Sequence, residues 1–327
     1  MAITNYIREI GRGKDGARSL SRDQAHDLFS QVLDGQVSDL EIGGFALAMR
    51  IKGESLAELD GFLDATHERC LQVPSTRPTV LLPSYNGARK LPNLTTLLAL
   101  LLAQEGVNVL VHGPQLDHGR VTTADIFRNL GLPMAHDADE IGHAWARREP
   151  VFIAIDALCP PLARLLEVRT KVGVRNSGHT VAKLLAPCRG AAQLRVVNYT
   201  HPEYAVLLAD LMVHTQANAL VLRGTEGEPI ADPRRAPKLD IFVAGQLRPD
   251  LSRPAHEGVL TELPVLPRTC DAATTALYIQ SVVSGEKPAP GPLMQQVECI
   301  LQTLHSIEHP HDTPQADLQP TKQEKSA

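Results

Sequence analysis

Cysteine is scarce in this chain of 327 residues, and its pattern excludes two common structural devices. The five cysteines are an odd number, and no two of them are separated by only two residues. A disulfide framework needs paired cysteines, and a structural zinc site usually contains a closely spaced pair. We therefore predict reduced thiols and no zinc site.

Long apolar runs and a secretory signal are also missing. The longest uncharged apolar run, residues 97–103, is much shorter than the roughly 20 residues that cross a bilayer. The first residues show no basic stretch followed by an apolar one, so no secretory signal is predicted. We expect a cytoplasmic protein without membrane contact.

The composition of the chain is typical of a globular protein. Apolar residues make up 43% of the sequence and charged residues 21%. A chain of this length buries about three quarters of the surface that its unfolded form exposes. That is enough for one large domain or two unequal ones.

The net charge of −5 conceals a basic region. Residues 160–199 contain seven lysines and arginines but one acid, Glu167, which gives +6 there and leaves −11 for the rest of the chain. A local excess of cations in an acidic protein indicates a face that binds anions.

The spacing of apolar residues predicts two kinds of structure. Residues 6–69 repeat apolar positions at helical spacing, with Ser21 and Ser55 as N-caps. From residue 79 onward, strand-like runs alternate with helical segments, which predicts an α/β domain with a mostly parallel central sheet. The predicted domains are a helical one at residues 1–75, an α/β one at 76–308, and a disordered polar tail at 309–327.

Two candidate sites follow the first strands of this sheet, where parallel sheets bind ligands. In one, Gly87 lies in a turn ahead of a helix start that is rich in polar side chains: Asn93, Thr95 and Thr96. This pattern fits a phosphate cradle and a capped turn equally well. In the next, His112 and Gly113 precede Arg120, and a plain turn explains them better than a site does.

Two more candidate sites come later in the chain. Arg169, Lys171, Arg175 and Lys183 are too many cations for a solvated face without partners, which favours anion binding. Glu226 and Glu228 follow a strand and are weak candidates for Mg²⁺, although a solvated turn explains them as well.

Together these segments resemble the anthranilate phosphoribosyltransferase family, over nearly the whole chain. That family has a helical subdomain before its α/β domain, and its first segment is a Gly-Thr-Gly-Gly-Asp loop for phosphoribosyl pyrophosphate, followed by Asn-Ile-Ser-Thr. Residues 93–96 here read Asn-Leu-Thr-Thr, His112 and Gly113 match a Lys-His-Gly motif, and Arg169 matches an arginine that meets the anthranilate carboxylate.

The departures from the family are specific. The loop reads Ser-Tyr-Asn-Gly-Ala at residues 84–88, so only Gly87 is retained, and the bulkier side chains crowd amides that must touch phosphate. The metal-holding Asp-Glu pair aligns with Glu228 and Pro229, which removes one carboxylate. These versions of the motifs resemble the YbiB-type bacterial paralogues of the enzyme, and this resemblance implies a homodimer, formed by the helical subdomain, that binds nucleic acid without sequence preference.

We therefore predict a DNA-binding protein rather than an enzyme, with RNA left open as a ligand and no cofactor. The phosphate-binding cations would be Arg164, Arg169, Lys171, Arg175, Lys183, Arg89, Lys90 and Arg120. The vestigial phosphoribosyl pyrophosphate site would be Gly87, Asn93, Thr95, Thr96, His112 and Gly113. The alternative is a Mg²⁺-dependent phosphoribosyltransferase with an altered acceptor, in which Glu226 and Glu228 hold the metal.

Overall fold

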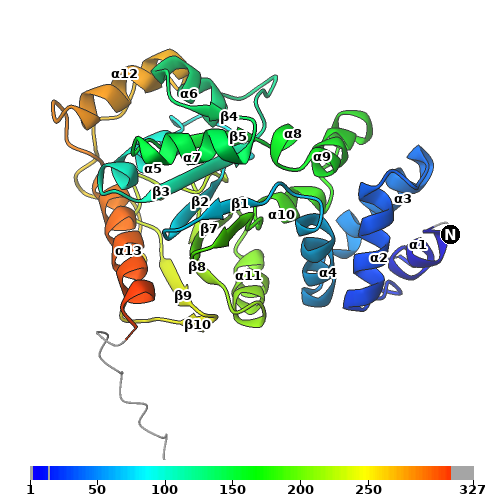
Figure 1. Cartoon of the computed structure of the whole chain (residues 1–327). Coiled ribbons are helices and arrows are strands. Elements are labelled where there is room, and N and C mark those ends of the chain that lie inside the picture. Colours follow the sequence, from blue (N-terminus) through cyan, green and yellow to red (C-terminus); the bar gives the residue numbers. More distant parts are fainter. Residues whose placement is uncertain (1–2, 14, 311–327) are drawn as a thin grey trace, which may run out of the picture.

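A computed structural model describes residues 3–13 and 15–310. A bundle of helices stands beside a larger α/β domain, as Figure 1 shows. The predicted fold class, a helical part followed by an α/β part with a mostly parallel sheet, is confirmed.

The first four helices begin at polar caps and enclose an aromatic core. They are α1 (Thr4–Ile10), α2 (Arg22–Leu33), α3 (Asp39–Lys52) and α4 (Leu56–His67). Capping boxes at Ser21, Ser38 and Ser55 begin α2, α3 and α4, because each serine binds a backbone N–H that the helix leaves unpaired. The rings of Phe29 and Phe62 stack with centroids 4.5 Å apart in the core.

Two helices from the middle of the chain, α9 (Pro160–Val172) and α10 (Gly178–Ala182), pack against the same bundle. The short helix α8 (Ile155–Leu158) precedes α9. Arg164 on α9 donates a hydrogen bond to the carbonyl oxygen of Leu33, and α10 contacts α4. The boundary predicted at residue 75 stays a prediction, and the helical layer also draws on residues 160–182.

An eight-stranded sheet forms the centre of the α/β domain, in the order β10-β9-β8-β7-β2-β3-β5-β4. From β8 to β4 neighbouring strands are parallel, and β9 and β10 add an antiparallel edge. The strands are β2 (Thr79–Pro83), β3 (Asn108–Gly113), β4 (Met134–Ala135), β5 (Val151–Ala154), β7 (Gln193–Tyr199), β8 (Asn218–Arg223), β9 (Leu239–Val243) and β10 (Gln246–Leu247). A small parallel pair, β1 (Val73–Ser75) and β6 (Cys188–Gly190), lies beside it.

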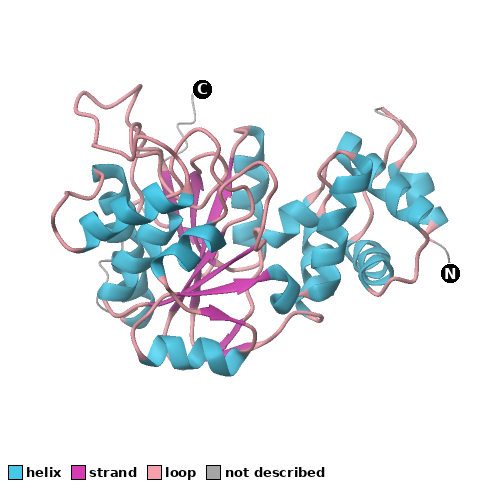
Figure 2. Ribbon diagram, turned by 90° about the horizontal axis from the view of Figure 1, so that it is seen from above, coloured by secondary structure: helices cyan, strands magenta, loops and turns pink. Residues whose placement is uncertain are grey.

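Helices cover both faces of the sheet, as the view in Figure 2 shows. Alternate residues of each strand enter two separate apolar cores, so that Val80 and Leu82 of β2 belong to one core and Leu81 to the other. The flanking helices are α5 (Thr95–Gln104), α6 (Thr123–Leu130), α7 (Ala138–Ala146), α11 (Glu203–His214), α12 (Ala272–Val283) and α13 (Gly291–Glu308).

Two sequence expectations concern the chain as a whole. Within residues 3–13 and 15–310, no helix combines the length and the apolar character that crossing a membrane requires. Of the tail predicted to be disordered, residues 311–327 lie outside the described residues.

Candidate anion-binding cleft

The carboxyl ends of β2, β3 and β8 bring three of the four candidate segments to one edge of the sheet. The other segment lies at the end of α9 and in α10, and its Lys183 reaches the same edge at Asn198 of β7. The loops after β2 and β3 touch, because Ser84 donates its backbone N–H to the carbonyl oxygen of His112 at 2.8 Å. A side chain at Gly113 would lie 1.9 Å from the Ser84 carbonyl oxygen, so only glycine allows this approach.

A carboxylate of the protein itself occupies the loop after β2. Glu228, 1% exposed, accepts backbone N–H groups from Asn86 at 2.7 Å and from Gly87 at 2.6 Å. The hydroxyls of Ser84 and Thr95 also donate to this carboxylate. The turn therefore does bind an anion, as its sequence suggested, but the anion is a side chain from the loop after β8.

Glu226 binds the next part of the same loop. Its carboxylate accepts backbone N–H groups from Arg89, Lys90 and Leu91 at 2.8 to 3.2 Å. Burial alone would raise the pKa of Glu226, but these N–H groups and the charge of Arg120 outweigh burial and lower it. The two glutamates together fasten the loop after β8 onto the loop after β2.

This arrangement does not fit Mg²⁺. Both carboxylates that the alternative assigns to the metal already accept backbone N–H groups, and a metal ion would have to displace those groups. Across the described residues, no group of three or more histidine, cysteine, aspartate or glutamate side chains is placed to hold a metal ion.

The remaining polar side chains of the predicted phosphoribosyl pyrophosphate site are buried, and those of Asn93 and His112 bind other residues of the protein. Asn93 donates to the Thr123 hydroxyl at 2.8 Å and accepts the backbone N–H of Thr95 at 3.1 Å, while Thr96 is fully buried. His112 is also buried, and its Nδ1 lies 2.8 Å from the Tyr85 hydroxyl. Desolvation lowers the pKa of His112 to about 3, so the imidazole is neutral.

Four of the predicted cations meet at the cleft: Arg120, Arg169, Arg175 and Lys183. Arg175 donates to the Asn86 side chain at 2.8 Å, and Lys183 donates to Asn198 at 3.1 Å and to the Gly227 carbonyl oxygen at 3.0 Å. Burial first, and then the charges of Arg169 and Arg120, lower the pKa of Arg175. Burial lowers the pKa of Lys183 to about 8.

The other predicted cations lie elsewhere. Arg164 contacts the bundle, and Lys171 lies 4.0 Å from Asp39 on α3. Arg89 and Lys90 are exposed at the rim of the cleft. The basic region was thus only partly a surface feature, since Arg195 within it is buried and donates to the carbonyl oxygen of Leu184.

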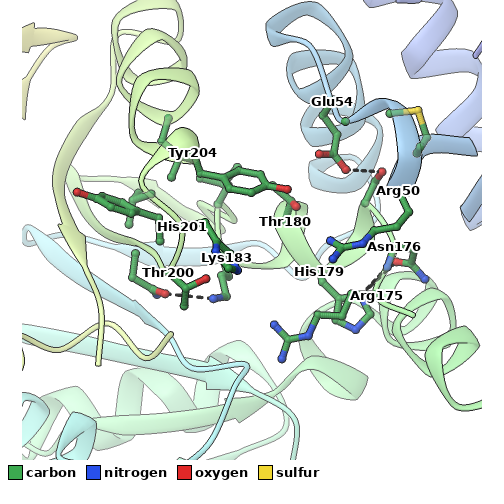
Figure 3. A pocket seen from close by; sticks show the side chains of 18 residues that line it. Arg50, Glu54, Arg175, Asn176, His179, Thr180, Lys183, Thr200, His201 and Tyr204 are labelled. Carbon is green, nitrogen blue, oxygen red and sulfur yellow. Dashed lines mark hydrogen bonds between the residues drawn. The ribbon is translucent and has the colours of Figure 1, made fainter. Parts of the chain in front are cut away.

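Two cavities are lined in part by residues of this site, one by Arg175 and Lys183 and the other by Lys90 and Glu226. One of about 200 Å³ lies between the helical bundle and β7, and Figure 3 shows Arg50 and Glu54 on one side of it and His201 and Tyr204 on the other. Glu54 accepts the Ser177 hydroxyl at 2.6 Å, and burial raises its pKa. Sequence reasoning missed Glu54, because nothing in its neighbourhood along the chain marks it.

The second cavity, of about 770 Å³, carries cations from three parts of the chain. Lys90 lines it together with Arg223, Arg235 and Lys238, and Glu226 forms part of its wall. Sequence reasoning did not select the cations beyond Lys90, although Arg234, Arg235 and Lys238 stand close together in the sequence.

Comparison with known proteins assigns a family to this architecture. The helical bundle domain of a glycosyl transferase family matches residues 4–70, and the α/β domain of the family matches residues 87–237. The uncharacterized protein YbiB of Escherichia coli K12 is 41% identical over 308 residues, which cover 92% of this chain and 94% of that protein. The chain belongs to this glycosyl transferase family.

More distant family members are enzymes by name. An anthranilate phosphoribosyltransferase of Methanopyrus kandleri is 30% identical over 67% of this chain and 63% of that enzyme. The crystal structure of the enzyme from Thermus thermophilus matches with a TM-score of 0.65 at 19% identity, covering 92% of this chain and 97% of that one. A Saccharomyces cerevisiae structure in complex with 4-fluoroanthranilate matches with a TM-score of 0.67 at 14% identity, covering 95% of this chain and 89% of that one. These structures share the fold.

Proposed function

We propose that this glycosyl transferase family member binds nucleic acid through the phosphate backbone and transfers no phosphoribosyl group. The observation that carries the proposal is the occupation of the loop after β2: Glu228 and Glu226 bind the N–H groups of residues 86, 87 and 89–91. An enzyme of this fold needs those groups for its substrate, whereas a protein that binds a phosphate backbone through side chains does not.

The cations around the fastened loops support a polyanionic ligand. Among the described residues, no carboxylate forms an ion pair with any of the following: Arg89, Lys90, Arg120, Arg169, Arg175 and Lys183. Arginine and lysine side chains that lack carboxylate partners bind phosphates and release the counterions of the nucleic acid.

The composition favours weak sequence discrimination. Aromatic residues form only 4% of the chain, so base stacking contributes little surface. Phosphate contacts fix position without reading bases, and DNA and RNA both present them. The partner is therefore nucleic acid, with DNA as the first ligand to test and RNA as the second.

A second copy of the chain completes the proposed assembly. Leu40, Leu47 and Ile51 of α3 are 86%, 46% and 69% exposed. Their spacing of seven and four residues places them on one stripe of the helix. An isologous pairing of two such stripes buries these side chains and doubles the number of cationic clefts.

The proposal is tested by fluorescence anisotropy of a labelled DNA duplex over a series of salt concentrations. Arg175 and Lys183 also hold loops, so Arg169→Ala and Lys90→Ala report phosphate contact more cleanly. Each lost phosphate contact is expected to reduce the slope of log affinity against log salt by about 0.9. The matched control is Arg77→Ala, an exposed arginine at the amino end of β2, which leaves the slope unchanged.

Three results would contradict the proposal. One is the absence of binding at low salt to duplex, single-stranded DNA and RNA alike. Another is a reduction of the salt slope in Arg77→Ala that equals the reduction in Arg169→Ala. The third is a phosphoribosylated product from phosphoribosyl pyrophosphate, Mg²⁺ and anthranilate, which would favour the enzyme instead.

A further inference from the structure

A second group of cations lines the cavity of about 770 Å³. Arg223 ends β8, Arg235 and Lys238 lie in the loop between β8 and β9, and Lys90 lies in the loop after β2. Of the cations that the sequence assigned to phosphate binding, only Lys90 lines this cavity. The proposed function therefore leaves most of this group unused.

Hydrogen bonds between loops fix the walls of the cavity. The backbone N–H of His256 donates to the carbonyl oxygen of Ala236 at 3.0 Å, and that of Leu260 donates to the carbonyl oxygen of Arg234 at 2.8 Å. Ala236 has a φ of +43°, in the left-handed region that residues other than glycine rarely adopt. Such a conformation persists only where the surrounding structure enforces it, and it is frequent at ligand sites.

The walls carry more positive than negative side chains, with five lysines and arginines against two carboxylates. One carboxylate, Asp232, lies 3.1 Å from Arg234, and Lys238 lies 2.9 Å from Asp240. The other carboxylate, Glu226, accepts backbone N–H groups of the loop after β2. Both acids of the wall thus have partners of their own.

Three cations of the cavity have no such partner. Across the part of the chain that the structure describes, no carboxylate forms an ion pair with Lys90, Arg223 or Arg235. All three are exposed, so a ligand reaches them without any movement of the fold. Three unpaired cations around one cavity fit an anion that carries several charges, and the N–H groups of arginine match the oxygens of phosphate.

We propose that this cavity is a second phosphate-binding site, separate from the cleft, for a ligand with two or more phosphate groups. Its volume lies within the range of about 300 to 1,000 Å³ that is typical of small-molecule sites. The phosphates belong either to a free molecule or to successive nucleotides of a nucleic acid bound in the cleft. Tyr199 lines both this cavity and the one of about 200 Å³, so the two cavities adjoin at this residue.

Isothermal titration calorimetry of the full-length protein with tripolyphosphate tests the site without nucleic acid. The double variant Arg223→Ala with Arg235→Ala is expected to weaken binding by about tenfold or more, because it removes charged hydrogen bonds to phosphate. The matched control, Arg18→Ala with Arg77→Ala, removes the same charge from two exposed arginines outside the cavity and is expected to keep the affinity. Arg169→Ala, which changes the cleft, is expected to keep it as well.

A second measurement separates the two sources of phosphate. The anisotropy titration of a labelled DNA duplex over a series of salt concentrations is repeated with the double variant. A slope of log affinity against log salt that is smaller by about 1.8, as two lost phosphate contacts require, means that nucleic-acid phosphates enter the cavity. Weaker binding of tripolyphosphate with an unchanged slope means that the ligand is a free molecule.

Two results would overturn the proposal: a double variant that matches its control in both measurements, and an equal loss of tripolyphosphate affinity in Arg169→Ala. If the unaltered protein binds no nucleic acid, the proposed function fails, and the tripolyphosphate titration still decides whether this site exists. Circular dichroism checks that each variant is folded. The single variants Arg223→Ala and Arg235→Ala replace the pair if the pair unfolds.

Discussion

Glu228 is buried against the loop after β2, where four donors bind its carboxylate. Its carboxylate accepts two backbone N–H groups and two hydroxyls in a site that water does not reach. A buried carboxylate is stable only when hydrogen bonds compensate for its lost hydration, and here the loop after β2 supplies them. The same contacts keep that loop closed.

Glu228→Gln is expected to lower the free energy of unfolding by about 2 kcal/mol. The side-chain amide of glutamine has one acceptor oxygen instead of two, so donors of the loop lose their partner while buried. Urea denaturation followed by circular dichroism measures the change. The matched control, Glu257→Gln, alters an exposed residue and is expected to be neutral. Equal free energies of unfolding for the two variants would show that the Glu228 carboxylate contributes nothing to stability.

Sequence reasoning located this site but not its occupant. Gly87, Asn93, Arg120 and Arg169 were selected because turns and cations after strands are typical of anion sites, and the structure brings them to one edge of the sheet. Glu228 was considered only as a metal ligand. Its bond to residues 86 and 87 joins loops about 140 positions apart, and no local pattern encodes such a contact.

At the scale of helices and strands, strong local sequence signals were sufficient to predict several elements. Ser21 and Ser55 were predicted as N-caps, and the capping boxes of α2 and α4 confirm them. The parallel strands β2, β3, β5, β7 and β8 were predicted because they are mostly apolar runs, whereas the short strands β1, β4 and β6 were missed. The hairpin of β9 and β10 was missed, since its strands are short and its turn, Ala244 and Gly245, lacks a strong turn signature.

The exposed apolar side chains of α3 lead to the prediction that the chain forms a dimer. A double variant, Leu47→Glu with Ile51→Glu, places charge on both sides of a self-pairing surface and is expected to halve the molecular mass in solution. Light scattering after size-exclusion chromatography measures this. Leu277→Glu on α12, where leucine is 66% exposed, is the matched control and is expected to keep the larger mass. A monomeric unaltered protein would contradict the prediction.

At the scale of the whole molecule, one buried and two partly buried histidines couple stability to pH. Burial lowers the pKa of His67 to about 4 and those of His112 and His179 to about 3. His67 accepts the backbone N–H of Ala186 at 3.0 Å, which requires a neutral ring. Below the ordinary histidine pKa of about 6.5, the unfolded chain therefore binds protons that the folded chain does not.

Stability is accordingly expected to be full above pH 6.5 and to decrease as the pH falls toward 4, by about 1.4 kcal/mol per pH unit for each histidine. Urea unfolding between pH 5 and pH 7, followed by fluorescence of Trp145, measures the slope. His67→Gln keeps an acceptor for Ala186 and is expected to remove one such contribution. His118→Gln, at an exposed position, is the control. A slope that His67→Gln leaves unchanged would exclude this coupling.

The closed loop after β2 also has a consequence for competition inside a cell. A tethered carboxylate is present at its binding site at an effective concentration of millimolar or more, however dilute the protein is. Nucleotides and sugar phosphates would have to outcompete it for the same N–H groups. Under the proposed function, the two glutamates keep small phosphorylated metabolites away from these N–H groups, while the exposed side chains of Arg89 and Lys90 stay available to a polymer that binds at many points.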